Sequence, residues 1–249
     1  MSGHSKWSQI KRQKGSNDAK RGQLFTRLGR EIAVAAREGG GDVNANFRLR
    51  LAVQRARESN MPLDNVERAI KRGIGGGESG DLDEINYEGY GPGGAAILVQ
   101  VMTDNRNRTV GEVRSVLNKH GGTLGESGSV AWQFEDRGVI TVALNGDNAE
   151  EIELAAIDAG AIDVSAGDDT IEVLTEPADL EAVRQALEST KAEIVNAERS
   201  LVASTTMALD GKQATQMLRL IDKLEDLDDV QKVYSNVEIS DEDMEAYEG

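Results

Sequence analysis

The chain of 249 residues contains no cysteine, only three prolines and two histidines, and aromatic residues make up 4% of it. The absence of cysteine excludes disulfide bonds, thiolate metal ligands and a cysteine nucleophile, and it is typical of proteins in a reducing compartment, so we expect the cytosol. No apolar run reaches membrane-spanning length and no apolar signal region follows Met1, so we expect no membrane partner. Because aromatics are scarce, any core must be built from aliphatic side chains and alanine.

Positive charge is also scarce overall, since the net charge is −16, but it is unevenly distributed. Residues 1–76 carry 16 Lys and Arg against 7 Asp and Glu, a net of +9, whereas residues 77–249 carry 12 against 37, a net of −25. This asymmetry favours a basic segment that binds an anionic partner. Charge alone supports equally well the alternative that the basic part docks on the acidic part of the same chain.

Residues 1–76 are expected to form a basic helical domain, with residues 1–15 as an extended arm able to pack on another domain. Hydrophobic periodicity predicts helices from residue 16 or 17 to 38, from 44 to 59, and from Pro62 to Gly73. The residues expected on their core-facing sides are Leu24, Leu28, Ile32, Ala35, Leu49, Ala52, Val53, Ala56, Leu63, Val66 and Ile70.

Beyond a glycine-rich linker at residues 73–83, strand and helix patterns alternate. Residues 138–204 follow the order β-α-β-β-α-β, which is the ferredoxin-like arrangement, and the flanking residues supply pieces of a second unit, including a strand at 130–134. We therefore predict an α+β protein in which a three-helix basic domain precedes two ferredoxin-like α/β domains, one inserted in the other. The predicted domains are 1–76, 77–136 plus 205–249, and 137–204. The acidic tail, residues 240–249, is expected to fray.

The sequence offers little support for catalysis. His4 lies among basic residues near the start, His120 lies at a predicted helix end, and no His, Asp and Glu cluster has metal-ligand spacing, so we expect no enzyme activity, cofactor or metal. Residues 89–94 match G-x-G-x-x-G, but a strand follows where a dinucleotide site requires a helix. A turn between antiparallel strands is favoured, and its amides at Gly91 and Gly93 are possible contacts for a phosphate or a base.

The cations of the N-terminal third are the best candidates for binding nucleic acid. Lysine and arginine suit phosphates, the guanidinium fork suits phosphates or base edges, and an aromatic ring can stack on an unpaired base. Trp7 is a further possible contact, although anchoring the chain end to the fold is favoured for it. The candidate contacts are His4, Lys6, Lys11, Arg12 and Lys14 in the arm, Lys20, Arg21, Arg27 and Arg30 in the first helix, and Arg48, Arg50, Arg55 and Arg57 around the second.

A second basic segment lies between a predicted strand and a predicted helix, at residues 104–109. Asp104 or Asn105 is expected to cap the helix. Arg106 and Arg108 are two of the few cations in the acidic region, and an additional contact with nucleic acid is possible for both.

Several long motifs of this chain resemble those of the YebC family. They are GHSKW (3–7), IK (10–11), DAKRG (18–22), FTRL (25–28), NMP (60–62), YEGYGPGG (87–94), TDNRNRT (103–109) and GSVAWQF (128–134). From residue 138 onward the similarity lies in the pattern of elements more than in motifs.

The resemblance implies a three-domain architecture and a role in gene expression. Bacterial members are commonly named probable transcriptional regulatory proteins and described as DNA-binding, whereas others, with the mitochondrial translational activator of cytochrome c oxidase, are described as ribosome-associated factors that help translation through difficult stretches such as consecutive prolines. Because the basic region lacks a clear recognition helix and the −25 remainder would repel a long duplex, we favour ribosomal RNA. A DNA-binding transcriptional regulator is the alternative, and an acidic protein-interaction adaptor is a more distant one.

Overall fold

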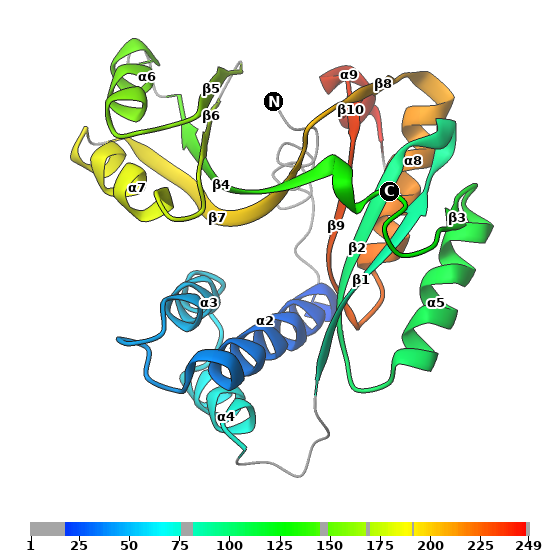
Figure 1. Cartoon of the computed structure of the whole chain (residues 1–249), viewed down its shortest axis with the longest axis horizontal. Helices are drawn as coiled ribbons and strands as arrows, with labels where there is room; N and C mark the ends of the chain where they lie inside the picture. Colours follow the sequence, from blue (N-terminus) through cyan, green and yellow to red (C-terminus); the bar gives the residue numbers. More distant parts are fainter. Residues whose placement is uncertain (1–17, 76–81, 145–148, 168–169, 191, 248–249) are drawn as a thin grey trace. The chain divides into compact units, whose positions relative to one another are not determined.

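The computed structural model describes residues 18–75, 82–144, 149–167, 170–190 and 192–247 (Figure 1). The protein is mixed α/β, with an N-terminal helical region followed by antiparallel sheets, as predicted. Two compact units are present. One comprises Trp132–Thr206, and the other comprises the described residues between 18 and 131 together with those between 207 and 247.

The helical region consists of α2 (Asp18–Gly39), α3 (Phe47–Glu58) and α4 (Leu63–Gly73). Leu28, Ile32 and Leu49 are buried in its aliphatic core, which confirms most of the predicted stripes. Leu24 and Leu63 are 41% and 57% exposed, so the prediction of core positions for them is wrong. Leu24 lies in the second turn of α2, whose 22 residues make it longer than the 12-residue α3 and the 11-residue α4, and Leu63 is the first residue of α4.

The turn between α2 and α3 is held by Asn46, whose side chain is buried. Its Oδ1 accepts the Leu49 amide at 3.0 Å, which makes Asn46 the N-cap of α3 and explains why the helix begins at Phe47 rather than at the predicted residue 44. Its Nδ2 donates to the carbonyls of Ala35 at 2.7 Å and Gly40 at 2.8 Å. One side chain therefore satisfies the end of α2 and the start of α3.

The larger unit also contains a sheet with the strand order β3-β1-β2-β9. Its strands are β1 (Asp83–Tyr90), β2 (Ala96–Thr103), β3 (Thr123–Leu124) and β9 (Val230–Ser235), and all neighbours are antiparallel. Helices α5 (Arg106–Lys119) and α8 (Gly211–Glu225) complete a core that includes Ile97, Leu117 and Met217. Here the chain forms the β1–β2 hairpin before its first helix, so its elements follow one another in a different order from those of the other unit.

The Trp132–Thr206 unit has the predicted order β-α-β-β-α-β. Its strands are β4 (Phe134–Ala143), β5 (Asp163–Ala166), β6 (Thr170–Thr175) and β7 (Glu193–Ala203), and its helices are α6 (Ala149–Asp158) and α7 (Leu180–Ser189). The strand order β5-β6-β4-β7 with antiparallel neighbours is the ferredoxin-like order. Ile140, Ile171 and Leu187 lie in the core between sheet and helices.

Two expected segments differ from the structure. Residues 130–134 do not form a strand: Val130 is buried, a 3-10 turn (Ala131–Gln133) follows, and β4 begins at Phe134. The acidic tail is ordered as far as Tyr247, since β10 (Val237–Ile239) pairs in parallel with β8 (Met207–Leu209) and α9 (Asp241–Ala246) follows. Ser240 caps α9, and Met244 of this helix and Tyr247 directly after it are buried in the core.

We expect Asn46→Ala to lower the free energy of unfolding by about 2 kcal/mol, because it removes a helix cap and leaves buried carbonyls without their donor. Urea denaturation followed by circular dichroism measures the change. Asn44→Ala is the matched control, since Asn44 is exposed in the same turn, and it should change the value by less than about 0.5 kcal/mol. Equal losses in the two variants would contradict the role assigned to Asn46.

Candidate nucleic-acid interface

The predicted contact residues of the arm lie outside the described residues. These are His4, Lys6, Trp7, Lys11, Arg12 and Lys14. Lys20 belongs to the first turn of α2, but its side chain is not among those described. The structure therefore places the candidate residues from Arg21 onward.

The three described arginines at the start of α2 have different surroundings. Arg21 is exposed, with its guanidinium 5.4 Å from the centre of the Phe25 ring. Arg30 forms an ion pair with Asp229 at 3.0 Å and also donates to the Asp228 carbonyl. Arg27 has a buried Nε without a hydrogen-bond partner, and burial lowers the pKa of Arg27 despite the nearby carboxylates of Glu225, Asp226 and Asp228. Arg27 and Arg30 thus face acidic groups of the same chain.

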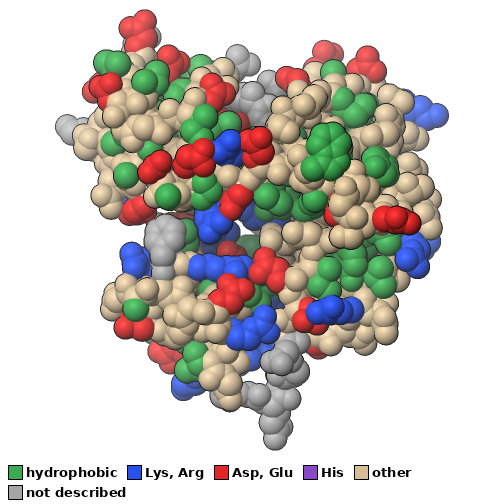
Figure 2. Space-filling model, in the orientation of Figure 1, with side chains coloured by type: hydrophobic (Ala, Val, Ile, Leu, Met, Phe, Trp, Pro, Cys, Tyr) green, Lys and Arg blue, Asp and Glu red, His purple; other side chains and the backbone are tan. Residues whose placement is uncertain are grey.

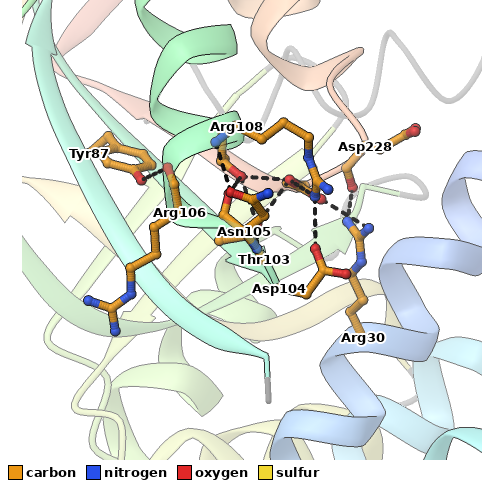
Figure 3. A network of polar contacts seen from close by, with 10 residues as sticks. Arg30, Tyr87, Thr103, Asp104, Asn105, Arg106, Arg108 and Asp228 are labelled. Atoms are coloured by element: carbon orange, nitrogen blue, oxygen red, sulfur yellow. Dashed lines mark hydrogen bonds and ion pairs between the residues drawn. The ribbon is translucent and has the colours of Figure 1, made fainter. Parts of the chain in front are cut away.

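Asp229, in the loop between α8 and β9, is the centre of a polar network. Figure 3 shows this network, with Arg30, Thr103 and Arg108 labelled. Its carboxylate is 3% exposed and accepts hydrogen bonds from Thr109 Oγ1 at 2.6 Å, Arg108 Nη2 at 2.7 Å and Thr103 Oγ1 at 3.1 Å. Figure 3 shows Arg30 reaching the network from α2 and Arg108 reaching it from α5. The network therefore joins the helical region to the β1–β2 sheet within one unit.

Ionisation of Asp229 is favoured by its partners. Burial opposes the charge, but the hydrogen bonds from Thr109 and Arg108, together with the charge of Arg30, lower the pKa of Asp229 below its ordinary value. The hydrogen bond between Arg108 and Asp229 also raises the pKa of Arg108. A carboxylate with two arginines and two hydroxyls around it is a fully satisfied buried charge.

The segment at residues 104–109 supplies much of this network. Asn105 caps α5 by accepting the Arg108 amide at 3.1 Å, which confirms the predicted cap. Arg106 pairs with Asp83 at 2.8 Å, and Arg108 also reaches Asp104 at 2.9 Å. Both arginines therefore have carboxylate partners inside the chain.

Of the four arginines predicted as contacts around α3, only some are available to a ligand. Arg48 pairs with Glu38 at 2.5 Å and Glu84 at 2.9 Å, and Arg55 pairs with Glu31 at 3.2 Å. Arg50 donates to the carbonyls of Val43 and Asn44. Arg57 is exposed, and within the described parts of the chain it has no carboxylate partner.

Two exposed cations that sequence reasoning did not select, Lys71 and Arg72, lie in the last turn of α4. Neither has a carboxylate partner among the described side chains. Cations at the end of an amphipathic helix ordinarily complement the helix dipole. The sequence therefore gave no reason to assign these two residues a binding role. In the structure they add to the open positive charge of the helical region.

The glycine-rich segment is a turn, as predicted. β1 and β2 are antiparallel, and the 3-10 turn Pro92–Gly94 connects them. Gly91 is buried, and a Cβ there would lie 2.7 Å from Ile97 Cδ1 and 2.9 Å from Met217 Sδ, so its role is close packing. Gly93 is exposed with φ of 72°, which leaves Gly93 as the candidate contact of the pair.

Glu88, which sequence reasoning also missed, joins two of the motifs. Its buried carboxylate accepts the amides of Gly128 at 2.6 Å and of Val130 and Ala131 at 2.7 Å each. Burial opposes ionisation, but these three amides lower the pKa of Glu88 below its ordinary value. The only feature of the sequence that could have indicated this role is a carboxylate in the second half of a strand, next to Gly89 and close to Gly91. The hydrogen bonds explain why residues 130–133 turn instead of pairing as a strand.

The described residues contain no group of three or more His, Cys, Asp and Glu side chains able to hold a metal ion. No helix among them is both long enough and apolar enough to cross a membrane.

The chain thus combines a helical region that carries exposed cations with antiparallel α/β units. The family profile described as the TACO1/YebC protein N-terminal domain matches residues 5–76, and the one described as the TACO1/YebC second and third domain matches residues 82–237. The chain belongs to the TACO1/YebC family.

Relatives of similar length share this sequence throughout. A "Probable transcriptional regulatory protein" from Chloroflexus aggregans is 55% identical over 251 residues, with 100% of each chain covered. One of the same name from Roseiflexus castenholzii is 54% identical, with 99% of each covered. The crystal structure of a conserved hypothetical protein from Aquifex aeolicus is 44% identical, with a TM-score of 0.82, and the match covers 90% of this chain and 93% of that one.

We expect Asp229→Asn to lower the free energy of unfolding by roughly 3 kcal/mol at neutral pH, because it removes the charge between two arginines. Since the pKa of folded Asp229 lies below its ordinary value of 3.8, the carboxylate stabilises the fold fully above pH 3.8, and this contribution is lost as the pH falls through the folded-state pKa. Urea titrations at several pH values should therefore show the difference between wild type and variant shrinking below pH 3.8.

Asp226→Asn is the control for this measurement. Asp226 lies in the same loop, and its ion pair with Lys223 is about half exposed, so its loss should cost no more than about 0.5 kcal/mol. A pH-independent difference for Asp229→Asn, or an equal loss for Asp226→Asn, would contradict the network's role.

Proposed function

We propose that this protein is a non-enzymatic, nucleic-acid-binding regulator of gene expression that acts in the cytoplasm on ribosomal RNA. The observation that carries the proposal is the segregation of charge, +9 in residues 1–76 against −25 in the rest, together with exposed cations of the helical region that have no carboxylate partner among the described side chains. Phosphate groups are the ligands that such a surface attracts most strongly. The proposal retains three domains, 1–76, 77–136 with 205–249, and 137–204, and assigns the contact to the first.

The intramolecular ion pairs narrow the proposed contact surface. Arg30, Arg48 and Arg55 bind carboxylates of this chain, so their role is to position the helical region. Arg106 and Arg108 also form ion pairs with carboxylates of this chain. The proposed contacts are then Lys6, Lys11, Arg12, Lys14, Lys20, Arg21, Arg57, Lys71 and Arg72, with His4, Trp7, Arg50 and Gly93 as further contacts.

The charges of α4 favour an RNA cleft over a DNA duplex. A recognition helix contacts base edges with the residues near its N-terminus. In α4 these positions include Asp64 and Glu67, both exposed, and their charge opposes a contact with the electronegative major-groove edge of guanine. The acidic remainder of the chain would also be repelled along a duplex, whereas a factor bound in a ribosomal cleft can direct it toward protein or solvent. In this role the protein eases elongation through difficult stretches such as consecutive prolines.

The test is sedimentation with ribosomes at moderate salt. Wild type should pellet with ribosomes, and the triple variant Lys11→Glu, Arg12→Glu, Lys14→Glu should bind at least tenfold more weakly. The slope of log affinity against log salt should also become shallower by about 0.7 to 0.9 for each phosphate that the variant no longer neutralises. The matched control reverses three exposed cations of the acidic part, Arg114, Lys119 and Lys212, with the same change in net charge. The proposal fails if wild type stays in the supernatant or if both triples weaken binding equally.

A DNA-binding transcriptional regulator is the second candidate, and the names of the relatives favour it. A regulator of this kind should prefer its promoter site over random DNA by roughly three orders of magnitude or more. A gel shift with promoter fragments and random competitor measures this preference. Equal competition by random DNA would exclude site-specific regulation, while a preference of that size without ribosome binding would replace the ribosomal proposal.

A further inference from the structure

Helix α6 is apolar on two opposite sides. Its inner side contributes Ile152 and Ala156 to the core of the Trp132–Thr206 unit, where both are buried. On the other side Leu154 and Ile157 are 62% and 59% exposed. Ile162, shortly after the helix, is 50% exposed. A surface helix ordinarily carries polar residues opposite its core face, so large aliphatic side chains at this place are unusual.

Carboxylates surround these aliphatic side chains. At about 100° per residue, Leu154 and Ile157 lie about 60° apart on the outer face, and Glu150 falls between them. Glu151, Glu153 and Asp158 occupy the rest of that face, and α6 contains no cation. Figure 2 shows acidic and hydrophobic side chains interspersed over the region of α6. We call Leu154, Ile157 and the four carboxylates the α6 surface.

We infer that the α6 surface binds a basic amphipathic helix of another protein. The aliphatic pair at i and i+3 provides the ridge that an apolar stripe of a second helix packs against, and the carboxylates match lysines and arginines along its edges. Phosphate chemistry does not fit this surface because it is uniformly negative. The inference goes beyond the proposed function, since it assigns a protein partner to a unit that the nucleic-acid contact does not use.

Fluorescence anisotropy with two labelled synthetic peptides and the full-length chain tests the inference. One peptide is an 18-residue helix with lysine on one face and leucine on the other, and the second has serine in place of every leucine and the same charge. Wild type should bind the leucine peptide at least tenfold more tightly than the serine peptide. Leu154→Ser with Ile157→Ser should abolish that preference, because two aliphatic side chains are no longer there to be buried.

Leu63→Ser is the matched control, because Leu63 of α4 is 57% exposed and lies in the other unit. It should leave the preference unchanged, and circular dichroism establishes that each variant is folded. Glu150→Lys with Glu153→Lys should weaken both peptides, which separates the charge contribution from the apolar one. Equal binding of the two peptides to wild type, or an equal effect of Leu63→Ser, would overturn the inference. A dimer in sedimentation velocity that Leu154→Ser with Ile157→Ser dissociates would also overturn it, because the surface would then be covered by a second copy.

Discussion

The ionised carboxylate of Asp229 is the constraint on which the arrangement of the larger unit depends. It lies in the α8–β9 loop, next to the end of β2, the start of α5 and the side of α2, and each of these three elements supplies it with a donor or a charge. A buried carboxylate is stable only when such partners surround it. The elements are therefore held in the one arrangement that satisfies it, and a small aliphatic contact among Ala33, Val34, Leu82 and Met102 lies between the same elements.

Contacts within the chain also determine how its positive charge is divided. Arg27 and Arg30 turn toward the acidic loop at Glu225–Asp229, while Arg48 holds Glu84 of β1. Docking on acidic groups of the same chain thus accounts for some of the basic residues, and others stay open to solvent. The cations left open to solvent are fewer than the composition implies, and they include Lys71 and Arg72, which lay outside the predicted set.

Local patterns were sufficient to predict most of the fold. Apolar spacing located all three N-terminal helices and the β-α-β-β-α-β order, because burying one face of a helix or strand imposes its period on the sequence. Two of the errors occur where a distant group decides. Residues 130–134 have strand composition, but the carboxylate of Glu88 takes their amides. The tail is acidic enough to suggest fraying, but Met244 and Tyr247 find space in a core formed by residues far away in the sequence.

The sequence by itself determined the segregation of charge, the helical and antiparallel elements, a helix cap at Asp104 or Asn105 and the family to which the chain belongs, because each depends on residues close together along the chain. Only the tertiary structure distinguished an arginine that binds Asp229 from one that faces solvent. Asp226, Asp228 and Asp229 are chemically equivalent in the sequence, and only burial between α2 and α5 makes the last of them the centre of a network. Burial and partnership are properties of contacts between distant segments, and they therefore appear only when the chain has folded.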